Sequence, residues 1–248
     1  MSDPKAFVIH LERSAQRRPQ VERLRASLPC ASEILPATDG ARLPQSEVDR
    51  VYVRQTQRPR YPFSLNRAEI GVFLSHRAAW RRIVADGLDY GLIFEDDAEL
   101  DAAAFARTCA LARKTTSLWT YALAPSQKTS IRGQVLAQGD GVALMRPGNP
   151  PLRAIAQFVS AQAARRLLAV TETFDRPIDT FLQMSWVTGV ELMAFDPSGV
   201  RDASSALGGS TIQAKSKPLR QKLAREALRP VYRVQVRFWH AFAKRPQF

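Results

Sequence analysis

The feature that most constrains this chain is a short apolar run that ends in three consecutive acidic residues. Residues 90–94 read Tyr-Gly-Leu-Ile-Phe, which is typical of a strand buried in a sheet, and Glu95, Asp96 and Asp97 follow directly. Adjacent carboxylates repel one another, and burying them unpaired is costly, so a positive group should lie beside them. A divalent cation that also holds substrate phosphates would meet this need. Alternatively, the acids are a solvated strand end or cap the helix that follows.

Length and charge indicate one medium-sized body with a basic appendage. The 248 residues are 45% hydrophobic, which is enough for a sizeable core. The net charge of +13 is uneven, because residues 213–248 hold ten Lys or Arg and one acidic residue. We therefore predict one globular domain over residues 1–212 and a basic amphipathic helical tail over residues 213–248.

Cysteine usage and the absence of long apolar runs predict the compartment. Cys30 and Cys109 lie far apart without metal-ligand spacing, which favours a reducing environment over a disulfide framework. The amino terminus lacks the apolar segment of a signal peptide, and no run approaches the ~18 apolar residues of a membrane-spanning helix. We expect a cytoplasmic protein that is attached to a membrane only at its surface.

Alternating strand-like and helix-like segments predict an α/β fold with a mostly parallel central sheet and flanking helices. Strand-like runs lie at residues 6–11, 33–37, 90–94, 118–123, 142–145, 155–159 and 190–195. Helical segments are expected up to about residue 28 and at residues 67–85, 102–113, 160–169 and 178–186, the last with a proline at its first position, and residues 196–210 read as a Gly/Ser-rich loop. Asn66 and Glu69 form a capping-box pattern at the start of the helix over residues 67–85.

Charged residues near the predicted strand ends are candidate ligand contacts. Arg13 and Arg17 follow the first strand, at the edge where open α/β sheets bind ligands, although they also fit a solvated helix start. Glu69 and His76 are seven residues apart and share one helix face. A catalytic pair is conceivable there, and the alternative is a capping role for Glu69 with a structural hydrogen bond for His76.

The tail reads as two basic amphipathic helices separated by Pro230. Its apolar positions are Leu219, Leu223 and Ala227, followed by Val231, Val234, Phe238 and Phe242, and its basic row is Arg225, Arg229, Arg233 and Arg237. This arrangement is typical of a helix that lies in the headgroup layer of an anionic membrane. The alternative is packing across the domain. A nucleic-acid partner is not expected, because the basic residues are confined to the tail and no recognition motif is found.

Five short segments in the first hundred residues occur in the order and spacing of one enzyme family. They are Val-Ile-His-Leu at 8–11, Arg-Arg at 17–18, Ala-Thr-Asp-Gly at 37–40, Ala-Glu-Ile-Gly-Val-Phe-Leu-Ser-His at 68–76 and Leu-Ile-Phe-Glu-Asp-Asp at 92–97. This combination resembles glycosyltransferase family 25 of bacterial lipopolysaccharide and lipooligosaccharide biosynthesis, which is related to collagen galactosyltransferase domains. His10 departs from the pattern, since the family usually has asparagine at this position.

The resemblance implies a GT-A-like nucleotide-diphospho-sugar transferase fold and transfer of galactose or glucose from a UDP-sugar, with inversion at the anomeric carbon. It implies a site with Mn²⁺ or Mg²⁺ at Glu95, Asp96 and Asp97, and nucleotide contacts from residues that include Arg13, Arg17, Asp39, Glu69 and His76. An inverting displacement also needs a general base. Our candidate is Asp179, which equally fits a helix-start acid that accepts from backbone N–H groups.

These inferences predict a glycosyltransferase, peripheral on the cytoplasmic face of the inner membrane, that adds a hexose to the core of a lipid-linked oligosaccharide acceptor. Two alternatives stay open. One is a catalytically inactive family relative that binds a saccharide or a protein partner, since fold does not fix function. The other is a nucleic-acid-binding protein that uses the basic tail.

Overall fold

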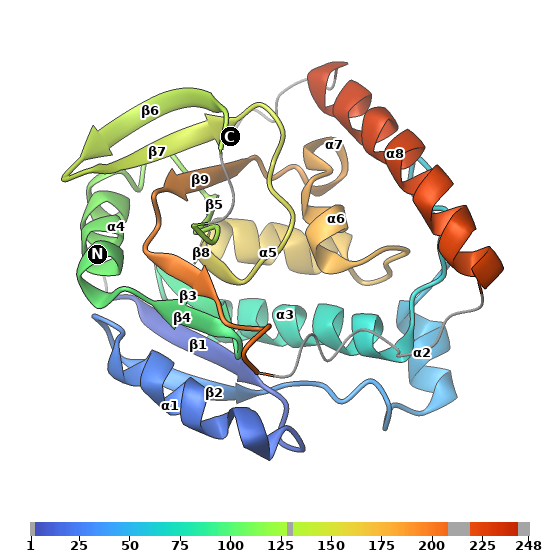
Figure 1. The fold of residues 1–248 in the computed structure, drawn as a ribbon, viewed down its shortest axis with the longest axis horizontal. Helices are drawn as coiled ribbons and strands as arrows, with labels where there is room; N and C mark the ends of the chain where they lie inside the picture. Colours follow the sequence, from blue (N-terminus) through green and yellow to red (C-terminus); the bar gives the residue numbers. More distant parts are fainter. Residues whose placement is uncertain (1–2, 128–130, 208–218, 243–248) are drawn as a thin grey trace.

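An eight-stranded sheet with helices on both faces forms the body of the protein in the computed structural model, which describes residues 3–127, 131–207 and 219–242 (Figure 1). From one edge to the other, the strands are β2 (Ser32–Pro36), β1 (Lys5–His10), β3 (Tyr90–Glu95), β8 (Ala156–Ser160), β5 (Tyr121–Leu123), β9 (Leu192–Asp196), β7 (Val142–Pro147) and β6 (Gly133–Gly139). Parallel pairing joins β2, β1 and β3, and also β5 and β9. Only β8 and β7 run against the other strands of this sheet, so the predicted mostly parallel α/β arrangement is confirmed.

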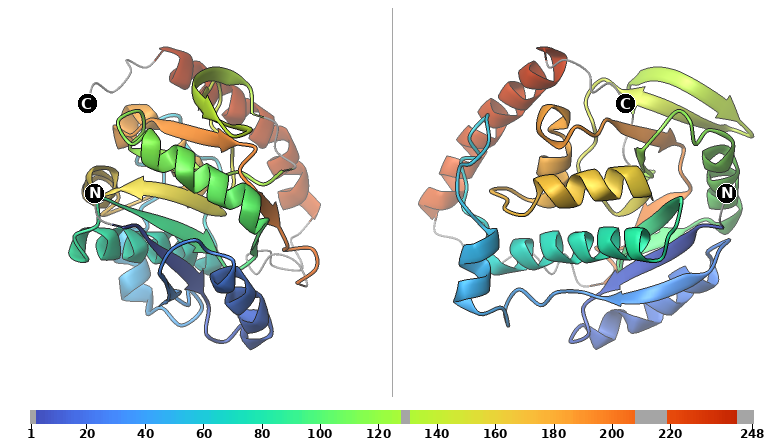
Figure 2. Two further views of the ribbon diagram at one scale, coloured as in Figure 1. Left: turned by 90° about the vertical axis from the view of Figure 1, so that its left-hand side faces the viewer. Right: turned by 180° about the vertical axis from the view of Figure 1, so that it is seen from behind.

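Helices cover the two faces of the sheet in separate layers (Figure 2). One face packs against α3 (Arg67–Ala85), α5 (Ala161–Val170) and α6 (Ile178–Leu182), and the other against α1 (Arg18–Ala26) and α4 (Ala102–Lys114). Successive β1 side chains alternate between these layers, since Phe7 belongs to the first core and Val8 to the second. Burial on both faces explains why β1 is apolar at nearly every position.

The long helix α3 begins and ends where its capping signals predict. Asn66 Oδ1 accepts from the Glu69 N–H at 2.8 Å, and Glu69 Oε2 accepts from the Asn66 N–H at 2.7 Å, which completes the capping box. At the other end, Gly87 has a φ of 65°, a left-handed conformation that favours glycine. The carboxyl-terminal end of α3 lies beside the start of β3, where a Cβ atom at Gly91 would lie 2.7 Å from the Ile83 side chain, and the middle of α3, at His76, lies beside Glu95 at the end of β3.

Three elements of the second half differ from the predictions. Residues 178–186 form two short helices, α6 and α7 (Ser185–Thr188), because the backbone leaves helical geometry at Met184; Pro177 lies at the N-cap and not at the first helical position. The Gly-containing loop after β9 contains a strand, β10 (Val200–Asp202), which pairs with β4 (Ala98–Leu100). β6 is a largely exposed edge strand, so its sequence carries no apolar alternation from which it could be predicted.

The prediction of two tail helices separated by Pro230 is wrong, because one continuous helix, α8 (Leu219–Phe242), contains this proline. Proline removes one helical hydrogen bond, but the next turns are held by tertiary packing. Tyr232 and Val236 are buried against the body, and the Trp186 and Trp239 rings lie 6.0 Å apart.

Two predictions for the tail lie outside what the structure describes. One is the domain boundary between residues 212 and 213, and the other is the apolar stripe of Leu219, Leu223 and Ala227. No helix within the described ranges is long and apolar enough to cross a membrane.

Candidate functional site

The carboxyl ends of β2, β1 and β3 meet at one edge of the sheet and form a pocket there. The parallel register places Ile9 beside Glu95 and His10 beside Pro36, so the loops after the three strands converge. We call this cavity of about 100 Å³ the strand-end pocket. Its lining includes Arg13, Arg17, Asp39, His76, Glu95, Asp96 and Asp97. Seven of the nine candidate site residues are therefore brought together at the predicted edge, and Glu69 and Asp179 lie elsewhere.

Two buried side chains contact Asp96. Arg17 is 2% exposed, and its Nη1 donates to Asp96 Oδ1 at 2.5 Å. His10 Nδ1 lies 3.1 Å from Asp96 Oδ2. Both Asp96 oxygens therefore have protein partners. Arg17 is the positive group that the sequence predicted beside the acids.

Glu95 is held by a hydrogen-bonded chain that begins in the core. The Tyr121 hydroxyl donates to Gln157 Oε1, and Gln157 Nε2 lies 3.2 Å from His76 Nδ1. Because the Gln157 amide donates, His76 Nδ1 accepts, and the proton on Nε2 faces Glu95 Oε1 at 3.3 Å. His76 therefore has the structural role that the sequence allowed as an alternative to a catalytic pair with Glu69. Its hydrogen bonds orient Glu95.

Asp97 differs from both neighbours, because its Oδ1 atom is buried without a hydrogen-bond partner among the described residues. The closest cation to Oδ2 is Arg17 Nη1, at 3.9 Å. Burial, together with the charges of Glu95 and Asp96, raises the pKa of Asp97 to about 7. An unsatisfied, buried carboxylate oxygen beside two other acids is the kind of group that a bound cation would satisfy.

The acids do not form a complete metal site by themselves. They suit a metal ion whose coordination is completed by a bound substrate. Within the described ranges, no three His, Cys, Asp or Glu side chains are arranged to hold a metal ion. Asp96 is already engaged by Arg17 and His10, which leaves Asp97 and Glu95 as the oxygen donors. Ions such as Mg²⁺ typically bind one or two carboxylates plus substrate phosphates, so a diphosphate could supply the remaining ligands.

Close packing of a helix on a loop shapes the other wall of the pocket. A Cβ atom at Gly71 of α3 would lie 2.5 Å from the Thr38 carbonyl oxygen, so only glycine allows this approach. Ser75 Oγ accepts from the Thr38 N–H at 2.8 Å. Residues 37–40 and 68–76, two of the five segments singled out in the sequence, therefore pack directly against each other. The same loop presents Asp39, whose Oδ2 accepts from Arg13 Nε at 2.8 Å at the pocket rim.

A second cavity of about 700 Å³, which we call the large cleft, adjoins the first. The two share Val72, Glu95 and Asp97. Asp179 lines the large cleft, its Oδ1 accepts from the Thr180 N–H at 2.7 Å, and burial raises its pKa. Both roles considered for Asp179 are therefore compatible with its position, since its carboxylate accepts from a backbone N–H at the start of α6 and also lines the cleft.

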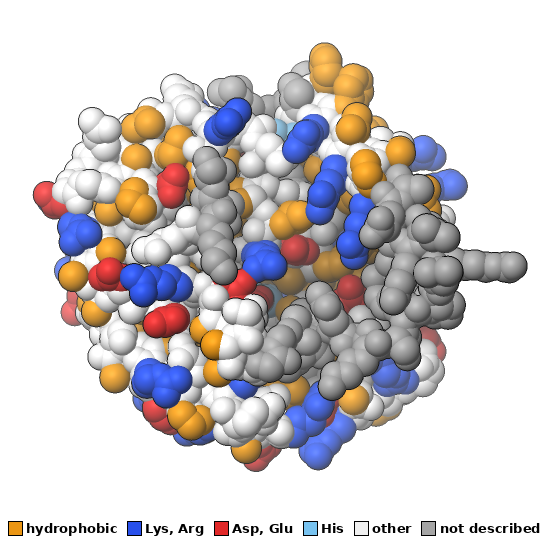
Figure 3. Space-filling model, viewed as in Figure 1, with side chains coloured by type: hydrophobic (Ala, Val, Ile, Leu, Met, Phe, Trp, Pro, Cys, Tyr) orange, Lys and Arg blue, Asp and Glu red, His pale blue; other side chains and the backbone are white. Residues whose placement is uncertain are grey.

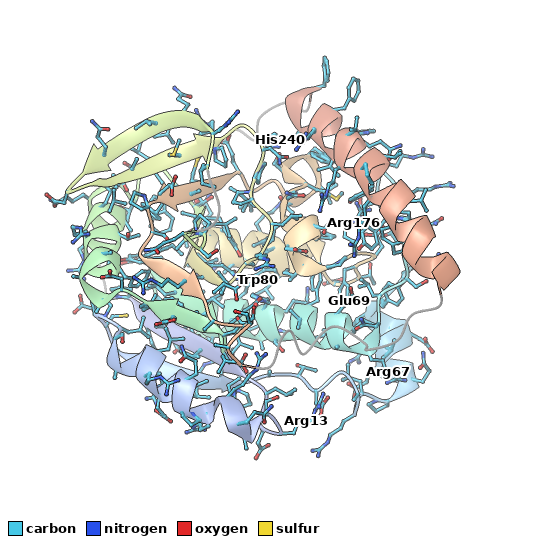
Figure 4. The ribbon with its side chains drawn as sticks, in the orientation of Figure 1. Arg13, Arg67, Glu69, Trp80, Arg176 and His240 are labelled. Carbon is cyan, nitrogen blue, oxygen red and sulfur yellow. The ribbon has the colours of Figure 1, made fainter. Side chains whose placement is uncertain are left out.

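Glu69 lines the large cleft as well, near the amino-terminal end of α3 (Figure 4). Its carboxylate is engaged in the capping box, and its partners do not include His76. The structure therefore does not bring Glu69 and His76 together as a catalytic pair. Capping of α3 accounts for Glu69.

Two residues of this region were not predicted from the sequence. β10 places Asp202 beside Ala98, and the negative charge of Asp202 contributes to the raised pKa of Asp97. Asp202 in turn pairs with Arg153, and both line the large cleft. The only sequence signal was an acid at the end of a three-residue strand inside a Gly/Ser-rich loop, which is too short to show a period.

Comparison with known proteins decides the family. The sequence profile described as glycosyltransferase family 25 (LPS biosynthesis protein) matches residues 3–138, more than half of the chain. The chain belongs to glycosyltransferase family 25. The matched range contains every segment of the strand-end pocket, so the predicted resemblance is confirmed.

Known members of family 25 resemble a limited part of this chain. The human inactive glycosyltransferase 25 family member 3 is 36% identical over 102 residues, which is 39% of this chain and 17% of that protein. Human procollagen galactosyltransferase 2 is 32% identical over 98 residues, which is 38% of this chain and 16% of that protein. The chain thus spans about a sixth of the length of these animal relatives. Among solved structures, A197 from STIV aligns with 87% of this chain and 99% of its own, with 10% identity and a TM-score of 0.39.

Proposed function

We propose that this family 25 chain is a UDP-hexose-dependent glycosyltransferase that transfers galactose or glucose to a saccharide acceptor with inversion. One observation carries the proposal: the strand-end pocket and the large cleft meet at Glu95 and Asp97. A transferase needs separate spaces for donor and acceptor that meet where the bond is exchanged. The strand-end pocket, at the carboxyl ends of parallel strands, suits the nucleotide, and the larger cleft suits an oligosaccharide.

The residues at this junction suit the departure of a diphosphate. When the acceptor oxygen attacks the anomeric carbon, the bond from that carbon to the UDP phosphate oxygen breaks, and the diphosphate gains negative charge. Asp97 and Glu95 would hold Mn²⁺ or Mg²⁺, which would supply the positive charge that stabilises the leaving group. Arg13 and Arg17 lie in the same pocket and add positive potential.

Asp179 is the proposed general base. It lines the cleft intended for the acceptor, and burial raises its pKa, which makes it a better proton acceptor than an ordinary aspartate. In the proposed step the proton of the attacking hydroxyl passes to the Asp179 carboxylate, which also accepts from the Thr180 N–H.

The proposed acceptor is a lipid-linked saccharide of the lipopolysaccharide or lipooligosaccharide core, used at a membrane surface. The family description supports the acceptor class. The exposed side of α8 supports the location: Val231, Val234, Phe238 and Phe242 lie outward, each more than half exposed. An amphipathic helix with an apolar arc and basic residues beside it is suited to the headgroup layer of an anionic membrane.

A second candidate is a family member that binds a saccharide without turnover. It is favoured by one observation, namely that a relative with 36% identity is described as inactive. Release of UDP from UDP-galactose and UDP-glucose, measured with Mn²⁺, with Mg²⁺ and with EDTA, distinguishes the two. We expect metal-dependent release that Asp179→Asn reduces by about a hundredfold while the exposed Asp140→Asn control leaves it unchanged. Binding of UDP-sugars without release under any condition would favour the second candidate.

A further inference from the structure

We propose that Arg229, Arg233 and Arg237 of α8 form a subsite for an anionic group, phosphate or carboxylate, carried by the saccharide acceptor. The inference rests on the proposed function, because it takes the large cleft to be the acceptor site. All three arginines line that cleft and none lines the strand-end pocket. They step by four residues and therefore project from one side of α8 in a row. Figure 3 shows Lys and Arg side chains gathered over α8, beside a hollow in this face of the molecule.

The three arginines are exposed and lack acidic partners within the described part of the chain. The ion pairs of the described residues do not involve them, although five acidic side chains line the same cleft: Glu69, Glu95, Asp97, Asp179 and Asp202. Guanidinium groups that face a cavity without partners are suited to bind phosphate or carboxylate, often with two hydrogen bonds each.

The end of β3 and the helix α8 bring opposite charges to the cleft, and this difference would favour one orientation of an anionic acceptor. Glu95 and Asp97 line the cleft at the end of β3, where it meets the strand-end pocket, whereas the three arginines line it from α8. A phosphate or carboxylate is repelled from the acidic end and attracted to the helix. The acceptor would therefore direct its charged group toward the arginines of α8 and a neutral hydroxyl toward the junction at Glu95 and Asp97.

The position of α8 is fixed by buried contacts, so its arginines are held in place before a ligand arrives. Arg176 is 0% exposed, and its Nη1 donates to the Tyr232 hydroxyl at 2.6 Å (Figure 4). The same guanidinium donates to both carboxylate oxygens of Asp175. The Tyr61 and Tyr232 rings pack edge to face at 5.3 Å. A helix anchored in this way loses little further entropy on binding.

The test uses the full chain and isothermal titration with three probes: trehalose 6-phosphate, its neutral parent trehalose, and UDP with Mn²⁺. We expect wild type to bind trehalose 6-phosphate about tenfold or more tightly than trehalose. Arg233→Gln/Arg237→Gln should weaken binding of the phosphorylated sugar about tenfold or more, and Arg233→Lys/Arg237→Lys by less, since charge is retained. The control Arg81→Gln/Arg107→Gln removes the same charge from exposed positions outside both cavities and should change nothing. UDP binding should be equal in all four proteins.

Three outcomes would overturn the inference. The first is equal affinity of wild type for the phosphorylated and neutral sugars. The second is unchanged trehalose 6-phosphate binding in the Gln variant or an equal loss in the control. The third is a matching loss of UDP affinity in the Gln variant, which would assign the arginines to the donor phosphates. If UDP binds to none of the proteins while the arginine-dependent binding of trehalose 6-phosphate persists, the anionic subsite stands and the proposed transferase fails.

Discussion

Asp97 differs from the other two acids at the end of β3 in how its carboxylate is satisfied. Asp96 forms an ion pair with Arg17 and contacts His10, and Glu95 is oriented by His76, whereas Asp97 Oδ1 is buried without a hydrogen-bond partner among the described residues. The sequence predicted that three adjacent acids need a positive group, but it could not assign partners to individual carboxylates. Those partners come from β1, α3 and the loop after β1, and only the tertiary fold brings them to β3.

Asp97→Asn should stabilise the metal-free protein and weaken its binding of UDP. The substitution removes the repulsion among the acids and costs no internal hydrogen bond of Oδ1, so the free energy of unfolding at pH 8 with EDTA should rise by about 2 kcal/mol. The affinity for UDP with Mn²⁺ should fall about tenfold or more. Urea unfolding and titration calorimetry measure the two quantities. A variant that is less stable and binds UDP as wild type does would show that Asp97 has a structural role alone.

Elements defined by local signals were predicted well, and elements defined by distant pairing were not. The bounds of α3 follow from Asn66, Glu69 and Gly87, which lie within or beside the helix. β10 exists because β4 lies beside it, about a hundred residues earlier in the chain, and three residues carry too little pattern to predict it. The continuity of α8 through Pro230 likewise depends on packing against the body and not on its own sequence.

Tyr232→Phe should destabilise the protein through one lost hydrogen bond. The buried Arg176 Nη1 would lose the hydroxyl that accepts from it, and an unsatisfied charged donor costs about 1–3 kcal/mol. Tyr52→Phe is a matched control, because its hydroxyl accepts from the neutral N–H of Leu65 and its loss should cost less. Chemical denaturation of the three proteins gives the comparison. A Tyr232→Phe variant as stable as wild type would mean that the contact with Arg176 does not hold α8 to the body.

At the scale of the whole molecule, α8 has three sides with different surroundings. One side is buried through Tyr232 and Val236, a second presents the arginines to the large cleft, and the third exposes apolar side chains to the outside. The sequence predicted both the apolar positions and the basic row, but not which side would pack on the body. The helix would thus place a membrane surface next to the opening of the cleft.

Removing apolar side chains from the exposed side of α8 should weaken membrane binding without unfolding the protein. Val234 and Phe238 are 63% and 60% exposed, so Val234→Gln/Phe238→Gln removes no core contact. Flotation with vesicles of phosphatidylcholine and phosphatidylglycerol should show binding of wild type and about a tenfold loss in the variant. Leu118→Gln/Val135→Gln, at exposed positions away from α8, is the control and should bind as wild type does. Equal flotation of all three proteins would exclude the apolar side of α8 as the membrane contact.

The central claim is that a cation joins the acidic end of β3 to the diphosphate of a nucleotide, and a crystal grown with Mn²⁺ and UDP tests it most directly. Anomalous scattering at the manganese absorption edge locates the ion independently of any assumption about its ligands. We predict one peak bonded to Asp97 and to diphosphate oxygens, with the uridine in the strand-end pocket. UDP bound in another place, or bound there with no manganese peak beside Asp97, would contradict the account.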